Sequence, residues 1–290
     1  MNTPNEPGAY AKLDGGIELW YRDEGNPDGE PMLLIMGLGS QLIAWPEDFV
    51  TDLAKRGYRV IRFDNRDCGL SSKIAGSISI PAYWLVDMAE DAAGLLAYLD
   101  IDQAHVVGAS MGGMIAQLVA IHHAEQVRTL CSIMSTTGNP LVGGASPEAI
   151  DAVLKPTPPE REKAIEHIAW VYGVIGSKTL AKEEHPRRVH LAAAAYDRMF
   201  YPDGTSRQFA AIVRASNRTA DLRNVLVPSL VVHGAEDSLI NISGGRATDA
   251  ALPDSVFLEL GAMGHDLPHR LHPQISAAID ANARRAAVTV

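Results

Sequence analysis

The chain has 290 residues, of which 47% are hydrophobic and 21% charged, a composition typical of a globular protein that can bury a large core. Its formal net charge of −10 argues against nucleic acid or an anionic membrane as a partner, because either would require a basic face. The two cysteines, Cys68 and Cys131, are too few for a disulfide framework and lack metal-ligand spacing, which favours reduced thiols and a cytoplasmic location.

Short β-like runs alternate with helical runs along the chain, which predicts a mainly parallel, eight-stranded sheet covered by helices on both faces. Residues 1–10 lack the features of a signal peptide, and no apolar stretch is long enough to span a membrane. Residues 10–13 and 17–21 are expected to form a hairpin around Asp14-Gly15-Gly16. The remaining elements are expected as strands at 32–36, 58–63, 104–109, 127–133, 228–233 and 255–260, and as helices near 46–56, 84–99, 111–123 and 273–286.

The alternation stops between residues 136 and 221. There, residues 159–175, 187–199 and 205–217 are predicted to be helical, and prolines separate them. We therefore expect a core made of residues 1–135 and 222–290, with 136–221 as a helical insertion.

Residues 106–113, VVGASMGG, place Ser110 between small residues where an apolar strand is predicted to turn into a helix. In a G-x-S-x-G turn the serine adopts a strained backbone conformation, so the residues two before and two after it must be small. Gly108 and Gly112 meet that demand. Together with the strand before it and the helix after it, the motif predicts a nucleophile elbow.

A serine is a weak nucleophile at neutral pH, so an elbow requires a general base and an acid that orients the base. The chain order expected for such a site is Ser, then Asp or Glu, then His. Asp237 follows the predicted strand within residues 228–237, and His265 follows the one within residues 256–265. Both lie beyond strand ends, the edge at which open α/β sheets bind ligands.

Alternatives exist for both residues. Glu236 competes with Asp237, but a one-residue shift reverses the direction of the side chain, and Asp237 is better placed. His269 and His272 compete with His265, but only His265 is preceded by a strand and a glycine. The other histidines are expected to pack within strands and helices or to lie on the surface: His105, His122, His123, His167, His185, His190 and His233.

A serine hydrolase also needs two backbone donors for the oxyanion of its tetrahedral intermediate. We expect one to be the amide of Met111, which follows the candidate nucleophile. The loop that ends residues 31–39, PMLLIMGLG, supplies the second candidate, the amide of Leu38. The same glycines could begin a dinucleotide-binding motif, but Leu42 stands where its third glycine should be.

The elbow, the order Ser110, Asp237, His265 and residues 64–71, DNRDCGLS, resemble the α/β-hydrolase superfamily over nearly the whole chain. Residues 64–71 are similar to its D-x-R-G-x-G-x-S loop, with Asp67 where glycine is usual, and Met36 replaces a histidine that often precedes the oxyanion glycine. The L-x-M-G start, the Trp-Pro pair and the D-x-R-D loop resemble the aclacinomycin methylesterases and similar bacterial carboxylesterases.

The resemblance implies that the helical insertion is a cap over the active site. Its larger apolar side chains could then line a substrate pocket: Trp170, Tyr172, Met199, Phe200 and Tyr201. The alternative is that most of them pack cap helices against one another, as aromatic residues at helical spacing usually do.

These residues predict a serine ester hydrolase that acts on small to medium, apolar esters through an acyl-enzyme intermediate, with no metal or organic cofactor. The same triad could hydrolyse a carbon–carbon bond, open a lactone or carry out perhydrolysis, because the fold does not separate these reactions. A ligand-binding protein without activity is a further alternative. The expected partner is a small-molecule ester, and the sequence leaves open whether the chain forms a homodimer.

Overall fold

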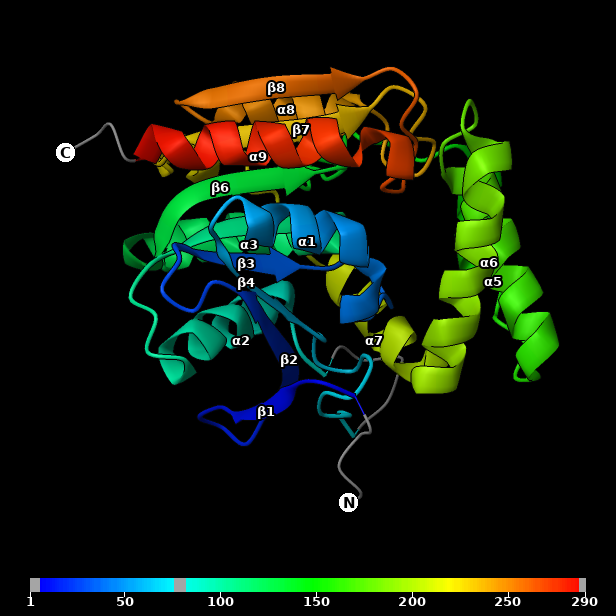
Figure 1. Ribbon diagram of the computed structural model, residues 1–290. Coiled ribbons are helices and arrows are strands. Elements are labelled where there is room, and N and C mark those ends of the chain that lie inside the picture. Colours follow the sequence, from blue (N-terminus) through cyan, green and yellow to red (C-terminus); the bar gives the residue numbers. More distant parts are fainter. Residues whose placement is uncertain (1–5, 76–81, 287–290) are drawn as a thin grey trace.

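The computed structural model describes residues 6–75 and 82–286, and within them eight strands form one sheet in the order β1-β2-β4-β3-β5-β6-β7-β8 (Figure 1). The strands are β1 (Ala9–Lys12), β2 (Glu18–Gly25), β3 (Pro31–Ile35), β4 (Arg59–Phe63), β5 (Ala104–Ala109), β6 (Val127–Ile133), β7 (Ser229–Gly234) and β8 (Ser255–Leu260). β2 runs antiparallel to both β1 and β4, and the other neighbouring strands are parallel. The predicted mainly parallel, eight-stranded sheet is confirmed.

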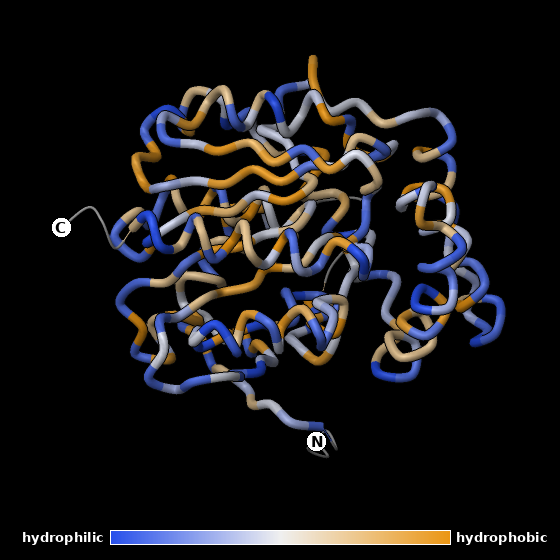
Figure 2. The backbone as a smooth tube through the Cα atoms, turned by 45° about the horizontal axis from the view of Figure 1, so that its top comes forward, coloured by the Kyte–Doolittle hydropathy of each residue, from blue (hydrophilic) through white to orange (hydrophobic). Residues whose placement is uncertain are grey.

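Helices cover both faces of this sheet (Figure 1). They are α1 (Glu47–Lys55), α2 (Leu85–Tyr98), α3 (Met111–His122), α4 (Pro147–Leu154), α5 (Arg161–Ile175), α6 (Ala181–Arg198), α7 (Pro202–Val213), α8 (Ser243–Ala251) and α9 (His272–Ala286). In β3, Leu33 and Ile35 pack with α2 and α3, whereas Met32 and Leu34 pack with α1 and α9. Side chains alternate between the faces of a strand, so a strand covered on both faces must be apolar throughout. Figure 2 accordingly shows the central strands as mainly hydrophobic.

The predictions for the core elements agree with the structure to within a few residues, except that α8 was not predicted. Its sequence, SGGRATDAA, contains two glycines and no large apolar residue, so it lacks the periodicity that identifies a helix. Cys68 and Cys131 are buried and free. In the part of the chain that the structure describes, none of the helices combines the length and apolar composition needed to cross a bilayer. Residues 1–5, part of the segment considered for a signal peptide, lie outside the described residues.

Four helices, α4 to α7, occupy the segment between β6 and β7, and α5 and α6 lie beyond the carboxyl ends of the parallel strands (Figure 1). Helix α6 begins at Ala181, six residues before the predicted start, and contains Pro186. A proline removes one hydrogen bond near the beginning of a helix, and here the helix continues through it. The prediction was also wrong at α4, which was missed although Ser146 caps it and Pro147 occupies its first turn.

Candidate active site

Ser110 lies at the junction of β5 and α3 with φ of +56°, a left-handed conformation that is uncommon for any residue except glycine. The turn is tight. A Cβ atom on Gly108 would lie 2.0 Å from the Gly112 carbonyl oxygen, and one on Gly112 would lie 2.0 Å from the Ile35 carbonyl oxygen. A side chain at either position would clash with a backbone carbonyl oxygen, which is why the motif requires glycine or another small residue there. The strained turn presents the serine beyond the end of the strand.

Three side chains distant in sequence form a continuous hydrogen-bonded chain. The Nε2 atom of His265 lies 2.8 Å from Ser110 Oγ, and its Nδ1 atom lies 2.8 Å from Asp237 Oδ2. Because an ionised carboxylate only accepts hydrogen bonds, His265 donates from Nδ1 and can accept the serine proton at Nε2. Asp237 follows β7, His265 follows β8 and Ser110 follows β5, so the sheet brings all three to one edge.

Asp237 is held as a carboxylate. Burial alone would raise its pKa, but His265, His233 and the Ile240 amide lower the pKa to about 2. Its Oδ1 atom accepts hydrogen bonds from the amides of Leu239 and Ile240 at 3.0 and 2.8 Å. The carboxylate is thus both charged and oriented, as a group that holds an imidazole in one tautomer must be.

His233 is a neighbour of this carboxylate that the sequence analysis treated only as a packing residue. It is fully buried, its Nε2 atom lies 2.8 Å from the Ile240 carbonyl oxygen, and the same nitrogen lies 3.5 Å from Asp237 Oδ2. Because a carbonyl oxygen can only accept, Nε2 carries the proton. The signal that could have identified the residue is its position at the end of β7, four residues before Asp237.

Glu236, the alternative acid, points to a different partner. Its carboxylate accepts hydrogen bonds from the amides of Lys178 and Thr179, at 2.6 and 3.0 Å, in the turn between α5 and α6. It therefore joins the β7–α8 loop to the helical segment and does not contact His265, whereas Asp237 does. The two adjacent carboxylates therefore bind different groups: Asp237 binds His265, and Glu236 binds the turn between α5 and α6.

The loop that carries His265 is joined to the end of α5. The amide of His265 donates to the Ile175 carbonyl oxygen at 2.9 Å, and the amide of Gly264 donates to Ser177 Oγ at 2.9 Å. Ser177 in turn donates to Asp266 Oδ1 at 2.6 Å. The helical segment thus holds the backbone at Gly264 and His265 and the side chain of Asp266, which sequence patterns within the core could not reveal.

The remaining histidines face other groups. His269 and His272 contact Asp48 of α1, and His123 contacts Glu90. His105 hydrogen-bonds to Thr129 inside the sheet, and the others lie at least partly in solvent: His122, His167, His185 and His190.

The loop after β3 lies against the candidate nucleophile. A Cβ atom on Gly37 would lie 3.1 Å from the Ser110 Cβ atom, and the Gly39 amide donates to Gln208 Oε1 of α7 at 2.8 Å. Among residues 6–75 and 82–286, neither the Leu38 amide nor the Met111 amide donates a hydrogen bond. Met111 directly follows Ser110 in the sequence, and Leu38 directly follows Gly37, which lies against Ser110. Within the described residues, neither amide is used in the hydrogen bonds of the fold.

The aromatic residues of the helical segment differ in their surroundings. Trp170 is 45% exposed and packs against His167 and the ammonium group of Lys155, at centroid distances of 5.5 and 5.1 Å. Phe200 packs on Tyr196 with ring centroids 4.8 Å apart. These contacts lie within the helical segment itself.

Two further residues of that segment contact the core. The Lys73 ammonium group of the core lies 5.5 Å from the centroid of the Tyr201 ring, whose hydroxyl also accepts a hydrogen bond from Arg207 of α7 at 2.6 Å. Burial raises the pKa of Tyr172, and a hydrogen bond with Ser40, in the loop after β3, partly offsets this. Tyr172 therefore lies near the loop that follows β3. Met199 is exposed at the end of α6.

The family model and the similar proteins described below are all hydrolases or have a hydrolase fold. A family model described as alpha/beta hydrolase fold matches residues 30–269. Rhodomycin D methylesterase DauP of Streptomyces sp. strain C5 is 28% identical over 292 residues, which cover 94% of this chain and 97% of that protein. 2-Hydroxymuconate semialdehyde hydrolase of Pseudomonas sp. strain CF600 is 30% identical, over 83% of this chain and 82% of that protein. The structure of an enol-lactonase from Burkholderia xenovorans LB400 matches with a TM-score of 0.77 and 23% identity, over 95% and 100% of the two chains.

Proposed function

The chain belongs to the alpha/beta hydrolase fold family, and from this premise we propose that it is a serine-dependent carboxylic ester hydrolase. The observation that carries the proposal is the hydrogen-bonded chain from Asp237 through His265 to Ser110, with 2.8 Å at both links. The methylesterase among its relatives supports an ester as the substrate.

In this mechanism, Ser110 Oγ attacks the ester carbonyl carbon while His265 Nε2 accepts its proton. The negatively charged carbonyl oxygen is stabilised by the amides of Leu38 and Met111. His265 then donates the proton to the departing alcohol, and an acyl-enzyme forms at Ser110. A water molecule, deprotonated by the same imidazole, releases the acid and restores the serine.

Asp237 acts through His265. Its charge stabilises the imidazolium that forms in each step, and its hydrogen bond to Nδ1 leaves Nε2 facing the serine. The reaction uses no metal or organic cofactor, because the serine supplies the nucleophile and the backbone amides supply the oxyanion donors.

We propose that α4 to α7 form a cap, and that the core consists of residues 1–135 and 222–290. The contacts of His265 with Ile175, of Glu236 with Thr179 and of Gly39 with Gln208 support this division, since each joins a core loop next to the serine to the helical segment. Tyr172 is the best-supported pocket residue because of its contact with Ser40. The pocket would favour small to medium, apolar esters.

A second candidate reaction is hydrolysis of a carbon–carbon bond by the same residues. The 30% identity to a 2-hydroxymuconate semialdehyde hydrolase favours it, because fold and triad are compatible with both reactions.

One experiment separates these reactions. Wild-type protein and the Ser110→Ala variant are assayed against a series of p-nitrophenyl esters, an aromatic methyl ester, a lactone and a vinylogous diketone. The ester hydrolase proposal requires the highest kcat/KM on an ester and loss of at least about 10⁴-fold in the variant. A preference for the diketone would support the second reaction, and tight binding without turnover of any compound would contradict both.

A further inference from the structure

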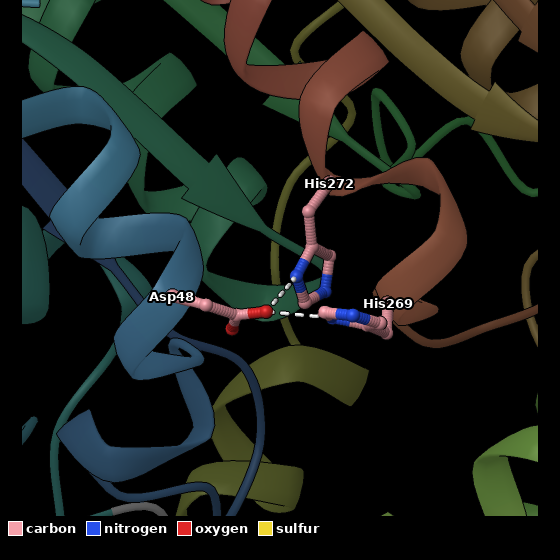
Figure 3. Close-up of side chains that lie close together, drawn as sticks. All are labelled: Asp48, His269 and His272. Carbon is pink, nitrogen blue, oxygen red and sulfur yellow. Dashed lines mark hydrogen bonds and ion pairs between the residues drawn. The ribbon is translucent and has the colours of Figure 1, made fainter.

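A second group of side chains converges where α1 meets the start of α9 (Figure 3). Asp48 belongs to α1, His269 begins the short helix η4 (His269–Leu271), and His272 is the first residue of α9. Asp48 Oδ2 lies 2.6 Å from His269 Nδ1 and 3.2 Å from His272 Nδ1. One potential ligand atom from each residue lies within 4.8 Å of the others.

The hydrogen bonding of His272 determines which of its nitrogens can bind a cation. Its Nε2 atom lies 2.9 Å from the Leu267 carbonyl oxygen, which can only accept, so Nε2 carries a proton. In the neutral ring, Nδ1 then presents a lone pair to the negatively charged carboxylate of Asp48. Two lone pairs would then face each other across 3.2 Å, so the contact is favourable when a proton or a metal ion lies between the two atoms.

This arrangement matches that of a metal-binding histidine, which usually donates its second ring N–H to a backbone carbonyl while the first nitrogen binds the metal. Two imidazole nitrogens and one carboxylate oxygen form a ligand set that suits Zn²⁺, with water in the fourth position. Asp48 and His269 are 41% and 58% exposed, so solvent can reach that position, while His272 is buried. Arg187 approaches the other carboxylate oxygen, Oδ1, at 3.5 Å and leaves Oδ2 to the two histidines.

We propose that Asp48, His269 and His272 form a binding site for a divalent transition-metal ion of the Zn²⁺ type. The site is separate from Ser110, His265 and Asp237, and it is not required for their chemistry. Its role is structural. It lies where α1, the segment that follows His265 and α6 meet, because the His269 amide also donates to Glu184 Oε1 of α6 at 2.9 Å. A bound ion would fasten the segment between His265 and α9 to helix α1.

The direct test is isothermal titration calorimetry of the full chain with ZnCl₂ after removal of metals by a chelator. The expected result is saturable binding of one ion per chain, with an increase in Tm at saturating Zn²⁺ because the ion binds the folded state. His269→Ala and Asp48→Asn should each weaken Kd by more than about 100-fold, since loss of even an outer hydrogen-bond partner of a metal ligand costs roughly 10–100-fold. His269 and Asp48 are exposed, so both variants should fold.

Two controls make the result specific. His185→Ala removes an exposed histidine of α6 outside the group and should bind Zn²⁺ as the wild type does. Ser110→Ala should also bind normally, so the outcome does not depend on the proposed ester hydrolysis. The proposal is contradicted if the wild-type chain binds no Zn²⁺, or if His269→Ala and Asp48→Asn retain wild-type Kd.

Discussion

Asp67 and Arg207 form a buried ion pair between the loop after β4 and helix α7. The guanidinium Nε and Nη2 atoms lie 2.8 and 3.1 Å from the two carboxylate oxygens, and the residues are 1% and 4% exposed. Asp67 has φ of +64°, a conformation that favours glycine, at the position where related loops usually carry one. Asp67 thus adopts a strained backbone conformation, and its carboxylate binds helix α7 to the core.

Breaking this pair should destabilise the protein. Arg207→Met leaves a buried carboxylate without its partner and should lower the free energy of unfolding by about 3–5 kcal/mol. The double variant Asp67→Gly/Arg207→Met should recover part of that loss, because glycine accepts the positive φ and carries no charge. Urea unfolding of the two variants measures both effects. A double variant no more stable than Arg207→Met would show that the unpaired charge is not the cause.

Replacement of Asp237 by asparagine should reduce turnover while nearly conserving the shape of the side chain. Asp237→Asn removes the charge and allows the wrong imidazole tautomer, so kcat on an ester should fall by about 10⁴-fold. Glu236→Gln changes the adjacent carboxylate, which contacts Lys178 and Thr179, and should retain kcat within about 10-fold. Steady-state kinetics on a p-nitrophenyl ester compares the two. Equal losses in both variants would remove Asp237 from its proposed role.

The lowered pKa of Asp237 predicts a pH dependence of stability. Its folded-state pKa of about 2 lies below the ordinary value of 3.8, so the carboxylate stabilises the folded state by about 2 kcal/mol above pH 4, a contribution lost as the pH falls toward 2. The stability difference between wild type and Asp237→Asn should therefore shrink on acidification, with about half of this contribution gone at roughly pH 3. Urea unfolding across this range measures it. A difference that stays constant with pH would contradict the assignment.

The tightness of the elbow can be tested by adding one methyl group. Gly108→Ala would place Cβ 2.0 Å from the Gly112 carbonyl oxygen and should destabilise the protein by at least about 1–3 kcal/mol. Gly144→Ala is the matched control, because its Cβ would meet no atom within 4 Å. Thermal unfolding should separate the two variants, and equal Tm values would contradict the packing argument.

The candidate site could be predicted from sequence because parallel strands end at a common edge. Once β5, β7 and β8 are recognised from their apolar runs, the residues that follow them must be close in space, and Ser110, Asp237 and His265 follow them. Strand β5 was predicted with its observed bounds because all its residues are buried, and only His105 interrupts a run of apolar and small residues. The sequence pattern within each segment was sufficient to predict these strands.

Contacts between segments could not be predicted in this way. Asp67 and Arg207 are separated by 140 residues, and no local pattern links them. His233 has no distinguishing mark within an apolar strand, although it lies next to Asp237. Likewise, the support that Ile175 and Ser177 give to the His265 loop depends on the packing of the helical segment, which amphipathic patterns alone do not determine.

The proposed ester hydrolysis depends most directly on Ser110 as the nucleophile. The protein is treated with an alkyl fluorophosphonate, which modifies activated serines irreversibly, and the adduct is located by peptide mass spectrometry while ester hydrolysis is followed in parallel. We expect one phosphonyl group per chain, on Ser110, with activity lost in proportion to modification and no adduct in Ser110→Ala. An adduct at another residue that tracks the loss of activity, or full activity with Ser110 modified, would contradict it.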